Sequence, residues 1–385
     1  MTRLPSRALL ATLALATSAP EAFATDINTG DLAGAYHATF CPRLEAELKT
    51  ARFGYTCKPS QGTVENIKRV IADPRQVGFG QLDILALEGV LAGNAPPVVV
   101  MRRDDARECL FAVTRNPDIQ SYGHLAANAA KLRFILPPEG SGSFATFKFL
   151  KTVDPDGLGK AGQVTTVKDT DEAIRLALAA DDTVTLFVQF PDPDNARFKL
   201  VNDQGGHFVP VIDRAILRPQ VGDQKIYFAQ ETQVANASWS KSGTKVVTAC
   251  TPLVVFTGSP ERVTDPKALQ DHRDLIATVR ALKTETMMPP EGLFARFWKR
   301  TMELSGATTE DLLKYSEEAR EKALPYIERA KQATEKAIDA AKPAIDRAAE
   351  ESKRLIEKAK EEAKELLDKG KPPATAPAKP EAPKQ

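Results

Sequence analysis

The stretch SQGTVEN at residues 60–66, together with its counterpart EGSGS at residues 139–143, decides how the fold is interpreted. Each follows a short run typical of a strand, residues 52–59 and 132–137, and each begins an amphipathic helix. The first amide groups of a helix have no intrahelical acceptor, and the helix dipole favours a negative charge beside them. Two such turns, about 80 residues apart, predict two lobes that hold one small anionic ligand between them.

Residues 1–24 are predicted to be an export signal. Two arginines precede a short apolar run at residues 8–16, and the triplet AFA at residues 22–24 is typical of a cleavage site. No cysteine follows that site, which argues against a lipid anchor, and no later run reaches the roughly 18 apolar residues that a membrane span requires. We therefore expect a periplasmic protein whose mature chain begins near Thr25.

The next residues alternate between strand and helix signals. The predicted strands are residues 26–30, 53–59 and 76–81, and the predicted helices are residues 32–49, the stretch from the Ser60 turn to residue 72, and residues 82–93. This β-α-β-α-β-α order implies a parallel sheet with right-handed crossovers. In such sheets ligands bind beyond the carboxyl ends of the strands, where the turns at Thr29, Ser60 and Gln81 are expected.

The same rhythm restarts after two predicted strands, residues 97–101 and 108–114, around a polar turn at residues 102–107. Further strands are predicted at residues 132–136, 163–167, 183–190, 198–201, 225–229 and 245–250, with helices from the Gly140 turn to residue 150 and at residues 170–180. Residues 253–256 are predicted to return to the first lobe as a strand, before a helix at residues 265–283. The chain is thus expected to cross between the lobes near residues 108–114 and 250–256.

The four cysteines are even in number, and an oxidising compartment makes disulfides the expected state. We predict a Cys41–Cys57 bond between the first helix and the next strand, which closes a loop of about 16 residues and contributes about 3 kcal/mol in the chain-entropy model. Cys109 and Cys250 fall at the two predicted crossings, where antiparallel strands lie about 5 Å apart. A Cys41–Cys250 bond would contradict both the pairing and the crossings.

Composition and motifs exclude several functions. With 52 basic and 51 acidic residues and no basic cluster with interleaved aromatic residues, no nucleic-acid partner is expected. Neither the cysteines nor the scattered histidines match a zinc pattern, and the phosphate-binding loop, the H-E-x-x-H motif and the G-x-S-x-G motif are missing. We predict no metal, no cofactor and no catalytic residue. A hydrolase built on Ser141 or Ser143 with a distant histidine is the weaker alternative.

From residue 27 to about residue 283 the chain resembles the periplasmic solute-binding proteins of type II topology, and within them the TAXI proteins, the binding subunits of one class of TRAP transporter. The matching stretches are TG at residues 29–30 with Gly34 and Tyr36, GTVENI at residues 62–67, GFGQLD at residues 78–83, GSGS at residues 140–143 and DEAI at residues 171–174. The resemblance implies two α/β lobes, a hinge of two strands, closure on a ligand and delivery to a membrane permease.

The predicted organisation is therefore a two-lobed α/β fold of the periplasmic-binding-protein type II kind, with a long α-helical C-terminal extension. The predicted parts are an export signal at residues 1–24, lobe I at residues 25–108 and 252–288, lobe II at residues 109–251, a helical extension at residues 289–370 and a disordered tail at residues 371–385.

The candidate ligand-binding residues come from both lobes. They are Thr29, Gly30, Tyr36, Ser60, Gln61, Gly62, Thr63, Gln81 and Asp83 in lobe I, and Ser141, Gly142, Ser143 and Gln189 in lobe II. Hydroxyl and amide donors suit a carboxylate without a buried opposite charge. The alternative is structural: Ser60, Ser141 and Asp83 would cap helices and Tyr36 would pack against its neighbours.

The C-terminal third has a different composition. After an aromatic segment at residues 293–298, an Ala/Lys/Glu-rich stretch carries an apolar stripe whose spacing of 3, 4 and 4 residues is typical of a nearly straight helix. Pro325 and Pro343 are expected to kink or restart it. Two interpretations are compatible with this pattern: a solvated helical stalk, and a helix for assembly, as in a coiled coil, or for contact with an envelope partner.

We therefore expect a non-enzymatic, periplasmic solute-binding subunit of a membrane uptake transporter. It would bind a small carboxylate-bearing solute by hinge closure and deliver it to an inner-membrane permease. The alternative is a degenerate binding fold that acts as a periplasmic docking or scaffold protein through its C-terminal helix, with self-association of that helix as one route.

Overall fold

The computed structural model describes residues 25–32, 34–237, 242–287, 302–303 and 306–369. The predicted export signal, the aromatic segment at residues 293–298 and the predicted tail from residue 371 lie outside these residues. The described residues up to Ala323 form one compact unit, and those from Leu324 form a second, so the two are described separately.

Lobe I is built on three parallel strands in the order β2-β1-β3. Its elements are β1 (Thr25–Asn28), the π-helix η1 (Tyr36–Phe40), α1 (Cys41–Thr50), β2 (Tyr55–Lys58), α2 (Thr63–Ala72), β3 (Val77–Gln81) and α3 (Leu82–Leu87). The β-α alternation is as predicted, but α3 is shorter than residues 82–93. It ends because Gly89 adopts a left-handed conformation, with φ 66°, which terminates a helix.

Two long antiparallel strands, β4 (Val98–Thr114) and β12 (Thr244–Gly258), join the two halves. The predicted polar turn at residues 102–107 is wrong, because β4 continues through these residues; within it, Arg102 bonds Asp104 at 2.6 Å. The predicted break between residues 250 and 253 is also wrong. Pro252 sits at a register shift in β12 and does not end the strand.

Lobe II repeats the α/β rhythm. Its strands are β5 (Arg133–Leu136), β6 (Gln163–Thr166), β7 (Thr183–Gln189), β8 (His207–Val209), β9 (Gln220–Val221), β10 (Gln224–Lys225) and β11 (Phe228–Ala235). Its helices are α4 (Tyr122–Asn128), α5 (Gly142–Val153), η2 (Leu158–Lys160), α6 (Thr170–Ala177), α7 (Ala196–Asp203) and α8 (Arg214–Leu217). The strand predicted at residues 198–201 is wrong: α7 begins where Asn195 accepts from the amide of Arg197, and it buries Phe198 and Val201.

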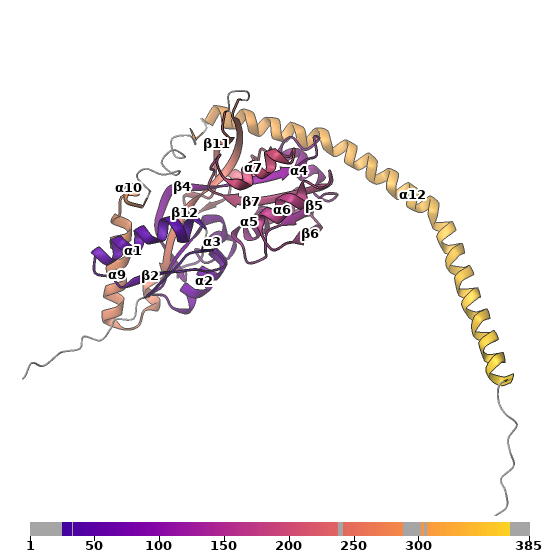
Figure 1. The fold of residues 1–385 in the computed structure, drawn as a ribbon, viewed down its shortest axis with the longest axis horizontal. Helices are drawn as coiled ribbons and strands as arrows, with labels where there is room; N and C mark the ends of the chain where they lie inside the picture. Colours follow the sequence, from indigo (N-terminus) through magenta and orange to yellow (C-terminus); the bar gives the residue numbers. More distant parts are fainter. Residues whose placement is uncertain (1–24, 33, 238–241, 288–301, 304–305, 370–385) are drawn as a thin grey trace, which may run out of the picture. The chain divides into compact units, whose positions relative to one another are not determined.

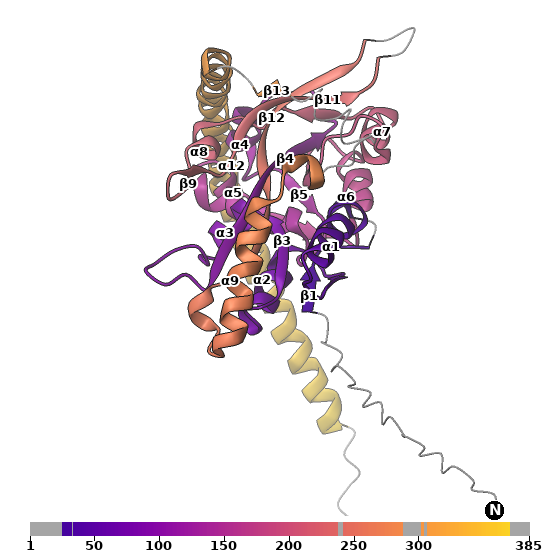
Figure 2. The same cartoon turned by 90° about the vertical axis from the view of Figure 1, so that its left-hand side faces the viewer.

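The strand order β2-β1-β3-β12-β4-β7-β5-β6 makes one continuous sheet through both lobes. Each lobe therefore has a parallel core completed by the two antiparallel strands that pass between them (Figures 1 and 2). This arrangement confirms the two-lobed α/β fold with a two-strand connection.

Both predicted disulfides are present. Cys41–Cys57 joins α1 to β2, and Cys109–Cys250 joins β4 to β12. The second bond lies where the chain passes between the lobes, as the predicted crossings required.

After β12 the chain forms η3 (Pro260–Arg262), α9 (Pro266–Ala281) and α10 (Thr284–Met287), and then β13 (Met302–Glu303), which pairs with β11. Helix α12 (Gly306–Lys369) follows, and its first turns are fixed to lobe II. Arg214 bonds Glu310 and Glu317 at 2.5 Å each, and Arg320 bonds the buried Asp154 at 3.0 Å.

Helix α12 continues from one compact unit into the other. A kink or a restart was predicted at Pro325 and Pro343; the helix continues through both prolines, so it does not restart there. Each proline removes only one backbone donor, and the surrounding Ala, Glu and Lys residues are strong helix formers. Within the described ranges, no helix combines the length and the apolar character needed to span a membrane.

Candidate functional site

The turns that follow β1, β2 and β3 lie at one edge of the sheet, because parallel strands end on the same side. The amino end of α5 in lobe II faces this edge. A Cβ atom built on Gly62 would lie 3.5 Å from the amide nitrogen of Gly142 and 3.6 Å from the carbonyl oxygen of Gly140. The structure thus places the two hydroxyl-rich turns opposite each other, with their backbones close together.

An inner cavity of about 170 Å³ opens beside these turns. Of the predicted residues, Gly30, Tyr36, Gln61, Gly62, Thr63, Gln81, Gly142 and Ser143 line it. Five further residues line this cavity that were not predicted as ligand contacts: Asp31, Gly34, Ala35, Glu108 and Val188. Both lobes therefore contribute to the walls.

An outer cavity of about 540 Å³ adjoins it, since Asp31, Gly34 and Gln61 line both. The predicted residues Ser60 and Ser141 belong to this outer cavity. Its other lining residues are Pro137, Pro138, Gly140, Lys168, Asp169, Thr170 and Arg197.

Three predicted residues line neither cavity: Thr29, Asp83 and Gln189. The hydroxyl of Thr29 donates to the carbonyl oxygen of Lys58 at 3.0 Å, and Oε1 of Gln189 accepts from Arg197 at 3.0 Å. Asp83 is buried and accepts two hydrogen bonds from lobe II. Each thus has a polar atom bonded within the protein, although Oδ1 of Asp83 and Nε2 of Gln189 are buried without a hydrogen-bond partner among the described residues.

Ser141 caps α5 as the structural alternative predicted, whereas Ser60 does not cap α2, whose N-cap residue is Gly62. Oγ of Ser60 accepts from the amide of Gly62 at 3.1 Å, and Oγ of Ser141 accepts from the amide of Phe144 at 3.2 Å. Oγ of Ser143 instead accepts from the amide of Val188 at 3.0 Å, so its own proton can be donated into the inner cavity. Helix geometry also leaves the amides of Gly142 and Ser143 without an intrahelical acceptor.

Glu108 is the main feature of the site that the sequence analysis missed. It lies on β4, where the chain passes between the lobes, and part of its surface faces the inner cavity. The hydroxyl of Tyr36 donates to Oε2 of Glu108 at 2.5 Å. Burial raises the pKa of Glu108 to about 7; hydrogen bonds from Tyr36 and Gln81 oppose the rise, and the charge of Asp83 adds to it. The sequence signal that could have indicated Glu108 as a site residue is its position beside Cys109, at a predicted crossing between the lobes.

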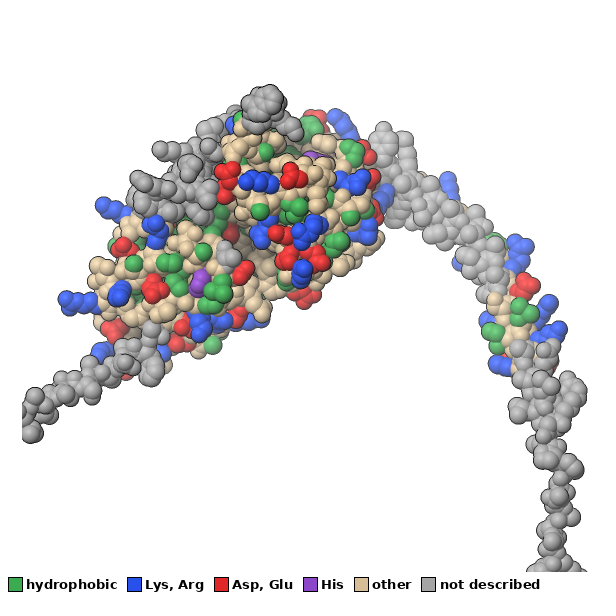
Figure 3. All heavy atoms as spheres, viewed as in Figure 1, with side chains coloured by type: hydrophobic (Ala, Val, Ile, Leu, Met, Phe, Trp, Pro, Cys, Tyr) green, Lys and Arg blue, Asp and Glu red, His purple; other side chains and the backbone are tan. Residues whose placement is uncertain are grey.

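The two cavities differ in charge. The described residues of the inner lining include two acidic side chains, Asp31 and Glu108, and no Lys, Arg or His. The outer lining adds Lys168 and Arg197, although Arg197 also bonds Asp171 at 2.8 Å. Across the face in Figure 3, acidic and basic side chains are interspersed. The described parts of the chain contain no group of His, Cys, Asp and Glu residues arranged to hold a metal ion.

No protein-family model and no curated protein matches the sequence. Solved structures are similar at low identity. An ABC-type phosphate transport receptor from Vibrio cholerae is 10% identical over 68% of this chain and 96% of its own, with a TM-score of 0.40. A binding protein of an ABC phosphonate transporter from Pseudomonas aeruginosa is 11% identical over 80% and 99%, with a TM-score of 0.35. A structure described as a periplasmic transporter is 9% identical over 81% and 98%, with a TM-score of 0.39. Such low identities and TM-scores do not indicate which ligand or partner this chain binds.

Proposed function

We propose that this chain is a periplasmic solute-binding protein that holds a small molecule between its lobes and delivers it to an inner-membrane permease, of the TRAP class that the sequence resemblance suggests. The observation that carries the proposal is the inner cavity, whose walls combine the turn at Gly62 with the turn at Gly142. A solute that contacts both turns binds the closed arrangement better than an open one, and therefore favours closure.

The charges of the lining refine the solute class. A carboxylate fits the amides and hydroxyl of Gly142 and Ser143, with Lys168 in the adjoining outer cavity. Glu108 would repel a second negative charge but accept a hydrogen bond from an amine or a hydroxyl. We therefore propose a small carboxylate-bearing solute that also carries a hydrogen-bond donor. A cavity of about 150 Å³ accommodates benzene, so the inner cavity suits a solute of similar size.

The test is isothermal titration and thermal unfolding of the purified protein against four sets of small solutes. The sets are carboxylates with an amine, carboxylates without one, amines without a carboxylate, and neutral polyols. A solute of the first set is expected to raise the melting temperature by mass action. Ser143→Ala should weaken its binding about tenfold through the lost hydrogen bond, whereas Ser352→Ala, an exposed serine in α12, should not. Indifference to all four sets would contradict the proposal.

A docking protein is the second candidate, and the anchoring of α12 on lobe II favours it. Farther along this helix, Leu355 and Ile356 are 60% and 56% exposed. If the helix self-associates, replacing both by glutamate should shift the full chain to a monomer in light scattering. An unchanged mass would remove self-association as its role.

A further inference from the structure

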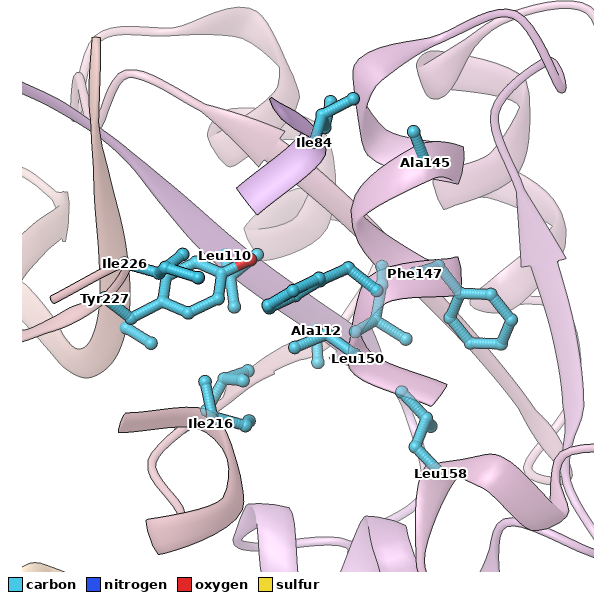
Figure 4. Packing of buried hydrophobic residues seen from close by; sticks show 14 of the residues in the cluster. Ile84, Leu110, Ala112, Ala145, Phe147, Leu150, Leu158, Ile216, Ile226 and Tyr227 are labelled. Atoms are coloured by element: carbon cyan, nitrogen blue, oxygen red, sulfur yellow. The ribbon is translucent and has the colours of Figure 1, made fainter. Parts of the chain in front are cut away.

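The two lobes share buried apolar clusters. In lobe I, helix α3 contributes Leu82, Ile84 and Leu85 to the same cluster as Ala145 and other residues of α5 in lobe II. Figure 4 shows Ile84 beside Ala145 within this packing. A Cβ atom on Gly142 would also lie 3.7 Å from Cδ1 of Ile84. Separating the lobes would therefore expose apolar surface of α3 to water.

A second buried cluster, composed mainly of lobe I residues, also includes a residue from lobe II. Phe190 follows β7 in lobe II, yet it belongs to the cluster of lobe I and is only 6% exposed. Its ring centroid lies 5.3 Å from that of Phe40 and 6.2 Å from that of Tyr36. An aromatic side chain from one lobe is thus inserted into the other.

A buried carboxylate adds a polar connection between the lobes. Oδ2 of Asp83, in the first turn of α3, accepts from the hydroxyl of Thr146 at 2.6 Å and from the hydroxyl of Tyr227 at 2.7 Å. Asp83 and Tyr227 are fully buried, and Thr146 is 2% exposed. Hydrogen bonds from two neutral donors to one carboxylate are stronger than neutral pairs and have strict geometry.

We propose that Asp83 and Phe190 form an interlobe latch that holds the two lobes closed before any solute binds. Both contacts form only when α3 lies against α5 and the end of β7 lies against lobe I. The disulfide between β4 and β12 limits how far the connecting strands can separate at the crossing. Solute exchange would then proceed through a minor open population. The latch goes beyond the proposed function and does not depend on which solute is bound.

The experiment measures the distance between the lobes in the full-length protein, freed of solute by unfolding, dialysis and refolding. Spin labels are placed at Lys68→Cys in α2 and Arg175→Cys in α6, two exposed positions in different lobes. Pulsed electron–electron double resonance of the otherwise unchanged, solute-free protein is expected to give a single short distance. The variants Asp83→Ala and Phe190→Ala should each add a longer-distance population of at least a tenth of the molecules.

A control variant separates opening of the lobes from general destabilisation, and a second latch variant covers a failure to fold. Phe198→Ala removes a buried aromatic ring that packs against Phe111 and Phe208 within lobe II, so it should lower the melting temperature without a longer distance. If an alanine variant does not fold, the combination of Tyr227→Phe and Thr146→Val removes both donors to Asp83 and should open the lobes in its place.

A long distance as the main population of the unsubstituted, solute-free protein would overturn the latch, and so would an unchanged distribution in all folded latch variants. Solute titration is scored separately. A protein that is closed yet binds no solute contradicts only the proposed function, and one that binds solute but is open without it contradicts only the latch.

Discussion

Replacing Glu108 by glutamine should change how the stability of this protein depends on pH. The carboxyl titrates near 4.5 in the unfolded chain and near pH 7 in the folded one. Between these values the folded state holds a proton that the unfolded state has released, so the free energy of unfolding falls as the pH rises. At about 1.36 kcal/mol per pKa unit the loss is up to about 3 kcal/mol, and water in the cavity reduces it.

Glutamine is neutral at every pH, and its Oε1 can still accept from the hydroxyl of Tyr36. Glu108→Gln should therefore match the unsubstituted protein near pH 4.5 and exceed its stability by up to about 3 kcal/mol near pH 8. The measurement is urea unfolding of both proteins at several pH values across this range. Glu88→Gln makes the same chemical change at an exposed glutamate and should show no such divergence. A stability difference for Glu108→Gln that stays constant from pH 4.5 to pH 8 would refute the assigned environment.

Three further predictions concern the backbone, the disulfides and the C-terminal helix. Gly62→Ala should lower the free energy of unfolding by about 1–3 kcal/mol, because the φ of 131° at this position is strained for alanine. Gly54→Ala is the control: a Cβ atom there would have no atom within 4 Å, so urea unfolding should show almost no change in stability. Replacing both cysteines of the Cys109–Cys250 disulfide by serine should destabilise the protein more than the same change at Cys41–Cys57. The closed loops of 141 and 16 residues correspond to about 5 and about 3 kcal/mol, respectively. Equal losses of unfolding free energy in chemical denaturation would contradict this. Arg320→Ala should speed hydrogen exchange of residues 309–323, and unchanged exchange there would show that its ion pair does not fix α12.

Local patterns predicted much of the fold. The period of apolar residues and the turn residues gave the β-α alternation, and the positions of Cys109 and Cys250 at two expected crossings gave their disulfide. Eight of the candidate ligand-binding residues line the inner cavity, because the ends of parallel strands and the helices that follow them are marked by nearby residues such as Gly62 and Ser143.

The sequence by itself determined that this chain has two α/β halves, where the helices after the Ser60 and Gly140 turns begin, and which cysteines meet. Only the tertiary structure decided what each polar side chain faces. Asp83 was a candidate ligand contact, yet its partners Thr146 and Tyr227 lie 63 and 144 residues away along the chain. Glu108 was expected at the start of a strand at residues 108–114, but only the pairing of β4 with β12 placed it at the cavity wall. The physical reason is that dihedral preferences and periodicity act over a few neighbouring residues, whereas burial, hydrogen bonding and pKa depend on chain segments that only folding brings together.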